Sequence, residues 1–213
     1  MVHKGNPLSG PFRPRPVREA FSRRANHQFT LVVLIEIKKT VDLPVIGIVK
    51  RDYSDSAVFI TATMKEIDEL AESGCEMVAL DATQRVRPFG ESLGDFVASI
   101  HSKYPEMLLM ADTATIEEAK EAEKLGFDCV STTLMGYTEE SKGDDIADDD
   151  FSRLKTIISE LSLPVIAEGN VNTPEKAKRC LELGVHAVVV GSAITRPQLI
   201  TKTFAETMKE AQN

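Results

Sequence analysis

A unit that recurs three times along the chain restricts the folds open to it. Each copy starts with a threonine that can cap a helix, namely Thr63, Thr115 or Thr173, and a glycine follows each helix. A short apolar run then completes the copy. Capping threonine, helix, glycine and apolar strand together are typical of the helix-to-strand half of a parallel sheet. The chain is therefore predicted to be an α/β protein.

The apolar runs predict six parallel strands. They are continuously apolar rather than alternating, as expected for strands that are covered on both faces. Further helices are expected at 92–103, 150–161 and 197–210, the second with Asp150 as its N-cap. Six such units make up three quarters of a (β/α)8 barrel of the TIM type, so we expect that fold, incomplete at the N-terminus. The six strands are PVIGIVK (44–50), MVALDA (77–82), MLLMAD (107–112), DCVSTT (128–133), PVIAE (164–168) and AVVVG (187–191).

Residues 1–34 differ in character from the rest of the chain. The first 30 residues contain six Lys or Arg against a single acid, Glu19, and several prolines. Few apolar side chains are available there to offset the entropy of ordering. We therefore expect 1–34 to be an atypical Pro/Arg-rich, disordered segment and 35–213 to be the catalytic barrel domain. At the boundary, FTLVVLIEI (29–37) fits a strand or a helix, because pattern alone does not resolve short apolar runs.

Charge and cysteine content narrow the partners and the compartment. The formal net charge is −8, which argues against nucleic acid as the main partner. No apolar run approaches the roughly 20 residues of a membrane-spanning helix, so no membrane association is expected. The three cysteines, Cys75, Cys129 and Cys180, have no metal-like spacing and indicate reduced thiols in a cytoplasmic protein. A homodimer is left open.

Polar side chains end several of the predicted strands. Lys50 ends the first, Asp112 ends MLLMAD, and Glu168 follows directly on PVIA. The C-terminal ends of barrel strands meet at one site, so this coincidence indicates an enzyme. A lysine there can serve as a base if its surroundings lower its pKa. A carboxylate placed directly after an apolar strand must be paired or must face a solvated cavity.

Two glycine turns indicate an anion site close to these side chains. Gly169 and Asn170 follow Glu168, and Gly191 and Ser192 end the last strand, with Arg196 one helical turn later. Glycine lets a phosphate oxygen approach backbone N–H groups, and arginine is suited to clamp a phosphate. The chain lacks a Gly-rich dinucleotide fingerprint and a Walker-type loop, so no organic cofactor is implied. The acidic run from Asp144 to Asp150 is interpreted as a solvated loop, and no metal is expected.

The motifs PVIGIVKRDY, LDAT with RPFGE, MAD, STTLMGYT, VIAEGN and VVGSAITRP resemble those of the N-acetylmannosamine-6-phosphate 2-epimerase family. The likeness runs from about Glu36 to the C-terminus. It implies a (β/α)8 barrel, an isomerase activity at C2 of an amino-sugar phosphate in sialic acid catabolism, and no organic cofactor. Lys50 and Glu168 match the catalytic positions, and Asp112 and Arg196 match substrate-contacting positions. Gly169, Asn170, Gly191 and Ser192 match the phosphate-binding turns.

The chain departs from that family before residue 35. The family's first two strands end in motifs that contribute a Gln and an Arg to the substrate site, and neither motif is present. Two alternatives to the epimerase therefore stay open. One is a catalytically impaired, incomplete barrel with exposed strand edges. The other is a different sugar-phosphate isomerase or epimerase barrel, such as a pentulose-phosphate epimerase or a phosphoribosyl isomerase.

Overall fold

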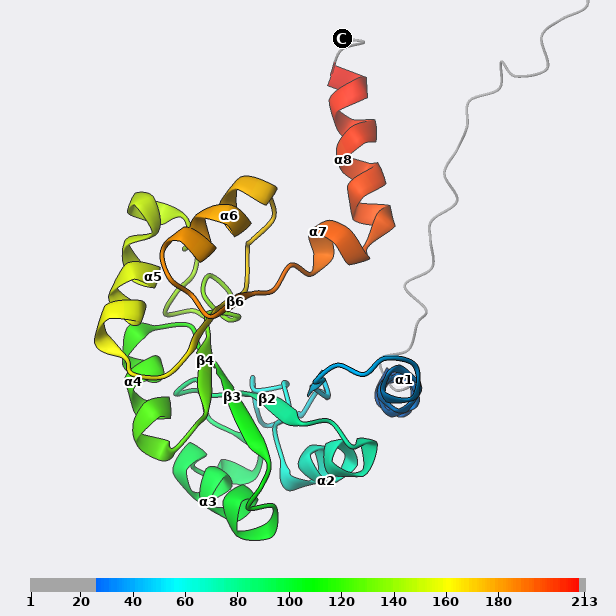
Figure 1. Ribbon diagram of the computed structural model, residues 1–213, viewed down its shortest axis with the longest axis vertical. Coiled ribbons are helices and arrows are strands. Elements are labelled where there is room, and N and C mark those ends of the chain that lie inside the picture. The colour runs from blue at the N-terminus through cyan, green and yellow to red at the C-terminus, as the bar shows by residue number, and fades with distance from the viewer. Residues whose placement is uncertain (1–25, 211–213) are drawn as a thin grey trace, which may run out of the picture.

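Six parallel strands form one curled sheet, covered on its convex side by helices (Figure 1). The structure, a computed structural model, describes residues 26–210. Neighbours in the chain are neighbours in the sheet, in the order β1 to β6. The predicted six β/α units of a barrel are thus confirmed, and they form a half-barrel. The strands are β1 (Ile46–Gly47), β2 (Met77–Asp81), β3 (Leu108–Asp112), β4 (Cys129–Ser131), β5 (Val165–Ala167) and β6 (Ala187–Val188).

The outer strands are shorter than their apolar runs suggested. Within the described residues, β1 pairs only with β2, and β6 pairs only with β5. A strand that is hydrogen-bonded on one side has half the ladder to hold it extended. The predicted strands 44–50 and 187–191 therefore shrink to two residues each. In the centre, β2 and β3 pair over five residues, which places Asp81 beside Asp112 at their C-terminal ends.

Helices α2 (Met64–Ser73) and α4 (Ile116–Leu125) begin and end where local signals placed them. In α2, Glu66 accepts a hydrogen bond from the Thr63 amide at 2.8 Å, and in α4 the Glu118 amide donates to the Thr115 hydroxyl at 3.2 Å. Gly74 and Gly126 close these two helices at φ of 73° and 88°, as C-terminal caps do. The helices after β1 are α2 (Met64–Ser73), α3 (Leu93–Lys103), α4 (Ile116–Leu125), α5 (Asp148–Glu160), α6 (Pro174–Glu182), α7 (Ser192–Thr195) and α8 (Pro197–Glu210), with a short 3-10 helix at Pro88–Gly90.

The start of α5 differs from the prediction. Its N-cap is Ala147 rather than Asp150, and residues 149–151 have positive φ values of 48°, 51° and 60°. The acidic residues before and within this turn are held by ion pairs instead of capping the helix. Asp150 pairs with Lys155, and Asp145 pairs with Lys176 at 2.8 Å. The expected N-cap at Asp150 is therefore wrong, and the Asp150 carboxylate pairs with Lys155 of the same helix instead.

The apolar run at 29–37 is helical. It lies within α1 (Asn26–Thr40), so a strand there is excluded. Leu34 is 8% exposed and joins the main core, and Lys38 forms an ion pair with Glu76 at the start of β2. The part of the proposed disordered segment that covers 1–25 lies outside the described residues. The proposed domain boundary at 34/35 falls inside this helix.

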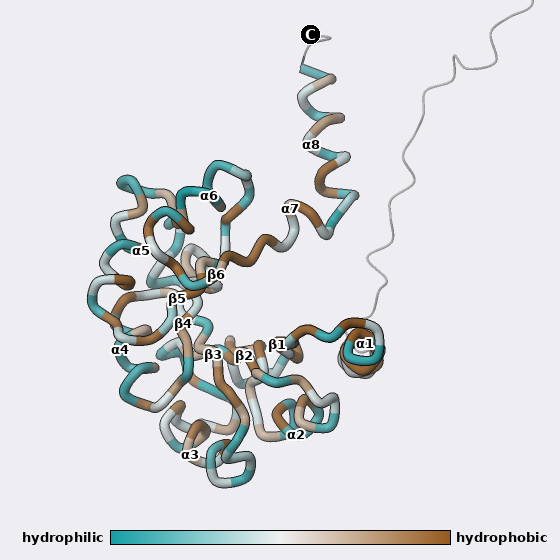
Figure 2. The backbone as a smooth tube through the Cα atoms, in the orientation of Figure 1, coloured by the Kyte–Doolittle hydropathy of each residue, from teal (hydrophilic) through white to brown (hydrophobic). Residues whose placement is uncertain are grey.

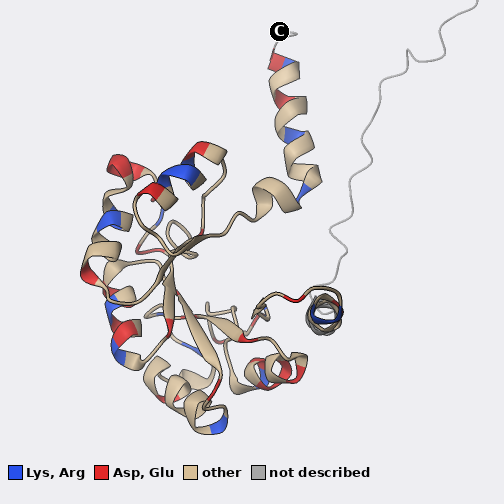
Figure 3. Ribbon diagram, in the orientation of Figure 1, with Lys and Arg blue, Asp and Glu red and all other residues tan. Residues whose placement is uncertain are grey.

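Apolar side chains fill both faces of the sheet, which explains the unbroken apolar runs. The outward side chains of β2–β4, such as Val78, Leu80 and Leu109, pack under the helices. Ala79, Met110, Cys129 and Ile166 form a separate cluster on the other face, the inside of the half-barrel. Figure 3 shows charges of both signs on the helices outside the sheet.

The C-terminal helices α7 and α8 lie apart from this body (Figure 2). Every residue of α8 is exposed, including Phe204 and Met208 at 68% and 67%. Across residues 26–210, no helix has both the length and the apolar character required to cross a lipid bilayer.

Candidate active site

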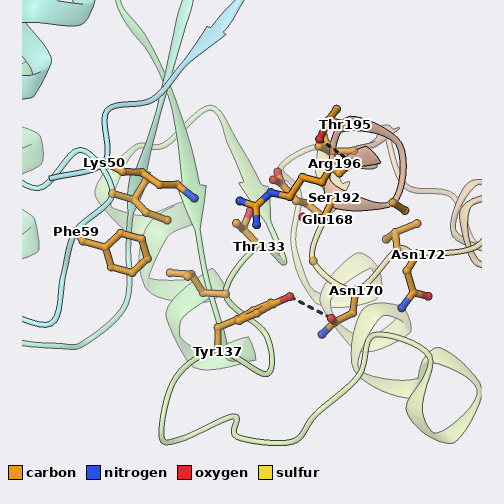
Figure 4. A pocket seen from close by; sticks show the side chains of 17 residues that line it. Lys50, Phe59, Thr133, Tyr137, Glu168, Asn170, Asn172, Ser192, Thr195 and Arg196 are labelled. Atoms are coloured by element: carbon orange, nitrogen blue, oxygen red, sulfur yellow. Dashed lines mark hydrogen bonds between the residues drawn. The ribbon is translucent and has the colours of Figure 1, made fainter. Parts of the chain in front are cut away.

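A cavity of about 710 Å³ lies at the C-terminal ends of the strands, between β1 on one side and β5 and β6 on the other (Figure 4). All the predicted site residues except Asp112 line it. They come from three separate segments, 50, 168–170 and 191–196, so the barrel topology brings them together. These lining residues are Lys50, Glu168, Gly169, Asn170, Gly191, Ser192 and Arg196.

Lys50 is held at the edge of the cavity by a turn after β1. Its backbone forms an isolated antiparallel bridge with Ile60, and the Arg51 amide donates to Phe59 O at 2.9 Å. The Phe59 ring lies 5.7 Å from Lys50 Nζ, within reach of a cation–π contact. The side chain is exposed and points into the cavity. The amine is therefore free to meet a bound molecule.

Glu168 is positioned by Thr132 at the end of β4. The Thr132 hydroxyl donates to Glu168 O at 2.7 Å and accepts from the Glu168 amide at 3.1 Å, which aligns the chain after β5. Burial raises the pKa of the Glu168 carboxyl, while Thr133, Lys50 and Ser131 each act to lower it. A carboxyl with a raised pKa is suited to both give and take a proton near neutral pH.

Asp112 lies beneath the cavity rather than in its wall. It is 2% exposed and accepts a hydrogen bond from the Thr133 hydroxyl at 2.9 Å. Burial, and then the nearby Glu168 charge, raise the pKa of Asp112 well above its ordinary range, and Asp81 adds to this. Thr133 lines the cavity above it. The structure thus brings Asp112 to the site as a buried neighbour of Thr133 and Glu168.

The two glycine turns form the far end of the cavity. Gly169 and Asn170 both have left-handed backbones, with φ of 82° and 56°. A Cβ at Gly169 would lie 2.9 Å from Thr133 O, so only glycine fits there. Gly191 precedes α7, whose first amides have no acceptor within the helix. Both turns therefore offer backbone N–H groups to an anion.

Arg196 closes the site from the side opposite Lys50. It ends α7, and its guanidinium points into the cavity toward the Lys50 amine (Figure 4). Glu168 and Thr133 line the same cavity as these two cations. An anionic molecule would reduce the repulsion between the cations, and arginine can bind a phosphate through two parallel hydrogen bonds.

Two residues that the sequence reasoning missed support the Gly169–Asn170 turn. The Tyr137 hydroxyl donates to Asn170 Oδ1 at 3.1 Å, and Lys176 Nζ donates to Asn170 O at 3.2 Å while pairing with Asp145. The polar run after β4, STTLMGYT, was a usable signal for Tyr137. Nothing local marks Lys176, because Asp145 lies 31 residues away in the chain.

Asp112→Asn is expected to be more stable than the parent, by a difference in unfolding free energy that grows as the pH rises. The folded state holds the Asp112 proton to higher pH than the unfolded chain, whose carboxyl has a pKa of about 3.9. The parent therefore loses about 1.4 kcal/mol of unfolding free energy per pH unit between these two pKa values, and asparagine avoids this loss. Urea unfolding from pH 4 to pH 8 measures the difference, with the exposed Asp42→Asn as the control. A difference that does not grow with pH would contradict the assignment.

A half-barrel of parallel strands with an amine, a carboxyl and an arginine around one cavity at the strand ends defines a (β/α)-barrel enzyme. The comparisons with known proteins agree. A family model described as "Putative N-acetylmannosamine-6-phosphate epimerase" matches residues 24–210. The chain belongs to this family, whose named members are 2-epimerases, an isomerase class of enzyme.

Relatives and solved structures show the extent of the likeness. Two relatives named "Putative N-acetylmannosamine-6-phosphate 2-epimerase" come from Oceanobacillus iheyensis and Enterobacter sp. The first is 63% identical over 171 residues, covering 80% of this chain and 77% of the relative. The second is 58% identical over 181 residues, covering 85% and 76%.

The solved N-acetylmannosamine-6-phosphate 2-epimerase from Clostridium perfringens is 45% identical, with a TM-score of 0.75 over 91% of this chain and 90% of that one. Thiamine phosphate pyrophosphorylase from Pyrococcus furiosus, at 18% identity and a TM-score of 0.54 over 83% of this chain and 70% of that one, shares the fold alone.

Proposed function

We propose that this chain converts N-acetylmannosamine 6-phosphate to N-acetylglucosamine 6-phosphate by moving the proton at C2, a step of sialic acid catabolism. The observation that carries the proposal is the meeting of Lys50, Glu168 and Arg196 with two glycine turns in one cavity. A small amino-sugar phosphate presents the matching groups: a carbon acid, a ring oxygen and a dianion. Membership in the epimerase family supports the same substrate.

Glu168 is assigned to ring opening. The C2 hydrogen becomes acidic only when the ring opens and C1 becomes an aldehyde, and opening needs acid and base assistance. The raised pKa of Glu168 suits a carboxyl that changes its protonation state during each turnover. Its side chain lines the same cavity as Lys50 and Arg196, where the reacting end of the sugar would sit.

Lys50 is assigned to the proton at C2. It is the only amine among the cavity-lining residues that the structure describes, and it points inward. Removal of the proton leaves an enolate whose negative charge the nearby cations stabilise. Return of a proton to the opposite face of C2 gives the epimer.

The phosphate is assigned to the turns at Gly169–Asn170 and Gly191–Ser192, with Arg196 as its clamp. Binding through backbone N–H groups at one end of the cavity fixes the open chain relative to Lys50 and Glu168. Asp112 acts on the substrate through Thr133 and Glu168, since it is buried below them.

The direct test is turnover by the purified chain. N-acetylmannosamine 6-phosphate is added, and the appearance of N-acetylglucosamine 6-phosphate is followed by NMR. Conversion supports the proposal. No conversion, together with normal binding of the substrate, would support the impaired-barrel alternative. Conversion only of a pentulose phosphate would support the other alternative.

The exposed apolar face of α8 supports a homodimer, and the free cysteines support a cytoplasmic location. Leu199, Ile200, Phe204 and Met208 are exposed on α8 at 42%, 36%, 68% and 67%, and such a face is normally covered by a partner. All three cysteines are free, in keeping with a reducing compartment.

Phe204→Glu is expected to convert the dimer to monomers in sedimentation experiments, while Lys202→Glu, on the same helix, should leave it intact. A parent chain that sediments as a monomer would contradict the dimer.

A further inference from the structure

Two hydroxyl groups connect the carboxyls of Asp112 and Glu168. Thr133 Oγ1 lies 2.9 Å from Asp112 Oδ1 and 2.6 Å from Ser131 Oγ. Ser131 Oγ in turn lies 3.5 Å from Glu168 Oε2, the longest of the three links. The side chains come from the ends of β3, β4 and β5, so the row runs across three neighbouring strands.

The two hydroxyl protons in this row cannot provide a hydrogen bond to each of two ionised carboxylates while also linking the two hydroxyls. Two hydroxyl oxygens at 2.6 Å need a proton between them, so either Ser131 or Thr133 donates to the other. A hydroxyl has only one proton to donate. The donor in this pair therefore has none left for its own carboxyl neighbour. With Thr133 donating to Asp112, Ser131 donates to Thr133 and leaves Glu168 without a hydroxyl proton. With Thr133 donating to Ser131 instead, Ser131 can donate to Glu168, and Asp112 must be protonated to donate to Thr133.

The surroundings favour one proton shared by the pair. Asp112 is 2% exposed, and ionising both carboxyls would place two negative charges close together with little water. The charged groups that face the pair from adjacent elements are Lys50 beyond β1 and Asp81 at the end of β2, with Arg196 across the cavity. Asp81 is itself engaged by Thr83 and Arg85. The raised pKa values of Asp112 and Glu168 agree with this arrangement.

We infer that Thr133 and Ser131 form a proton relay that lets Asp112 store the proton used by Glu168. The inference rests on the proposed function of Glu168. In the forward step Asp112 gives its proton to Thr133 Oγ1, Thr133 gives its own to Ser131 Oγ, and Ser131 gives its own to Glu168 Oε2. Each O–H bond that breaks is matched by one that forms, and the negative charge moves from Glu168 to Asp112. The reverse shift restores the starting state.

The relay gives Thr133 and Ser131 the role of positioning residues. It lets Glu168 change its protonation state without admitting water to the space that holds the open-chain sugar. It also explains why an aspartate is kept below the cavity wall, where it does not reach the substrate.

Thr133→Val tests the relay, because valine keeps the shape of threonine and removes the hydroxyl. We expect kcat for the epimerisation to fall ~10-fold or more, yet less than the roughly 10²–10⁴-fold of losing an acid–base group itself, with KM near the parent value. The acid limb of the pH–rate profile should move to higher pH, since the Thr133 hydrogen bond lowers the pKa of both carboxyls. Thr133→Ser should restore both.

Thr113→Val is the matched control. Its hydroxyl is buried and donates to Ser131 O at 2.9 Å, outside the row of carboxyls and hydroxyls. This variant should lose similar stability but keep the parent pH profile. A Thr133→Val enzyme with the parent profile and kcat would overturn the relay while leaving the epimerase assignment standing.

A second measurement does not depend on turnover. Infrared spectroscopy of the parent at pH 7 should show a protonated carboxyl band that disappears in Asp112→Asn and shifts in Thr133→Val. NMR titration should show the Asp112 and Glu168 carboxyl carbons responding to each other in the parent and not in Thr133→Val. Absence of the band, or independent titration in the parent, would overturn the relay even if the chain turned out to be inactive.

Discussion

Lys50→Ala is expected to abolish exchange of the C2 proton of N-acetylmannosamine 6-phosphate with solvent deuterium. Lys50 is the cavity-lining amine, and its side chain points from the turn after β1 toward Glu168 and Arg196. Losing a positioned base typically lowers a rate by roughly 10²–10⁴-fold. Proton NMR of the substrate in deuterated buffer measures the exchange directly and separately from product formation.

Substrate binding should survive this change. The turns at Gly169–Asn170 and Gly191–Ser192 offer backbone N–H groups that the substitution leaves in place. Calorimetric titration should therefore give an affinity close to that of the parent. Lys142→Ala, in which an exposed lysine paired with Glu139 is removed, is the control and should exchange normally. Exchange at the parent rate in Lys50→Ala would show that another group moves the C2 proton.

Glu168→Gln is expected to lower turnover of the cyclic substrate by roughly 10²–10⁴-fold, the usual effect of losing an acid–base group. The glutamine amide keeps the size of the side chain and leaves the Thr132 contacts to the backbone of residue 168 intact. It removes the group that changes its protonation state. The defect should therefore lie in ring opening, while Lys50 stays able to act.

An open-chain substrate separates these two steps. An analogue that cannot close its ring should exchange its C2 proton in Glu168→Gln at a rate much nearer to that of the parent. Glu139→Gln, at an exposed position outside the cavity, serves as the control and should match the parent with both substrates. Equal loss of exchange with cyclic and open-chain substrates would assign Glu168 to the C2 step instead.

Much of the half-barrel could be read from local signals. Thr63 with Glu66 and Thr115 with Glu118 act within four residues, so their helix starts do not depend on the rest of the fold. Gly74 and Gly126 end the same helices for an equally local reason. The polar strand ends at 50, 168 and 191 predicted the cavity, because parallel strands that follow one another must share one edge.

Tertiary contacts decided the remainder. The apolar run at 29–37 fits a strand or a helix by pattern, and the choice follows from packing Leu34 into the core and pairing Lys38 with Glu76. The turn at Asp149–Phe151 departs from the expected cap, and the acidic residues around it pair with Lys176 of α6 as well as with Arg153 and Lys155 of α5.

The sequence by itself determined the α/β class, the order of the six strands and the side chains at their C-terminal ends, since these depend on spacing along the chain. Only the tertiary structure decided how deep each side chain lies. Asp112 and Glu168 each follow an apolar strand, yet Glu168 lines the cavity and Asp112 is buried behind Thr133. Depth depends on the curl of the sheet and on neighbouring strands. Two hydroxyl groups connect carboxyls 56 positions apart only because three strands meet there.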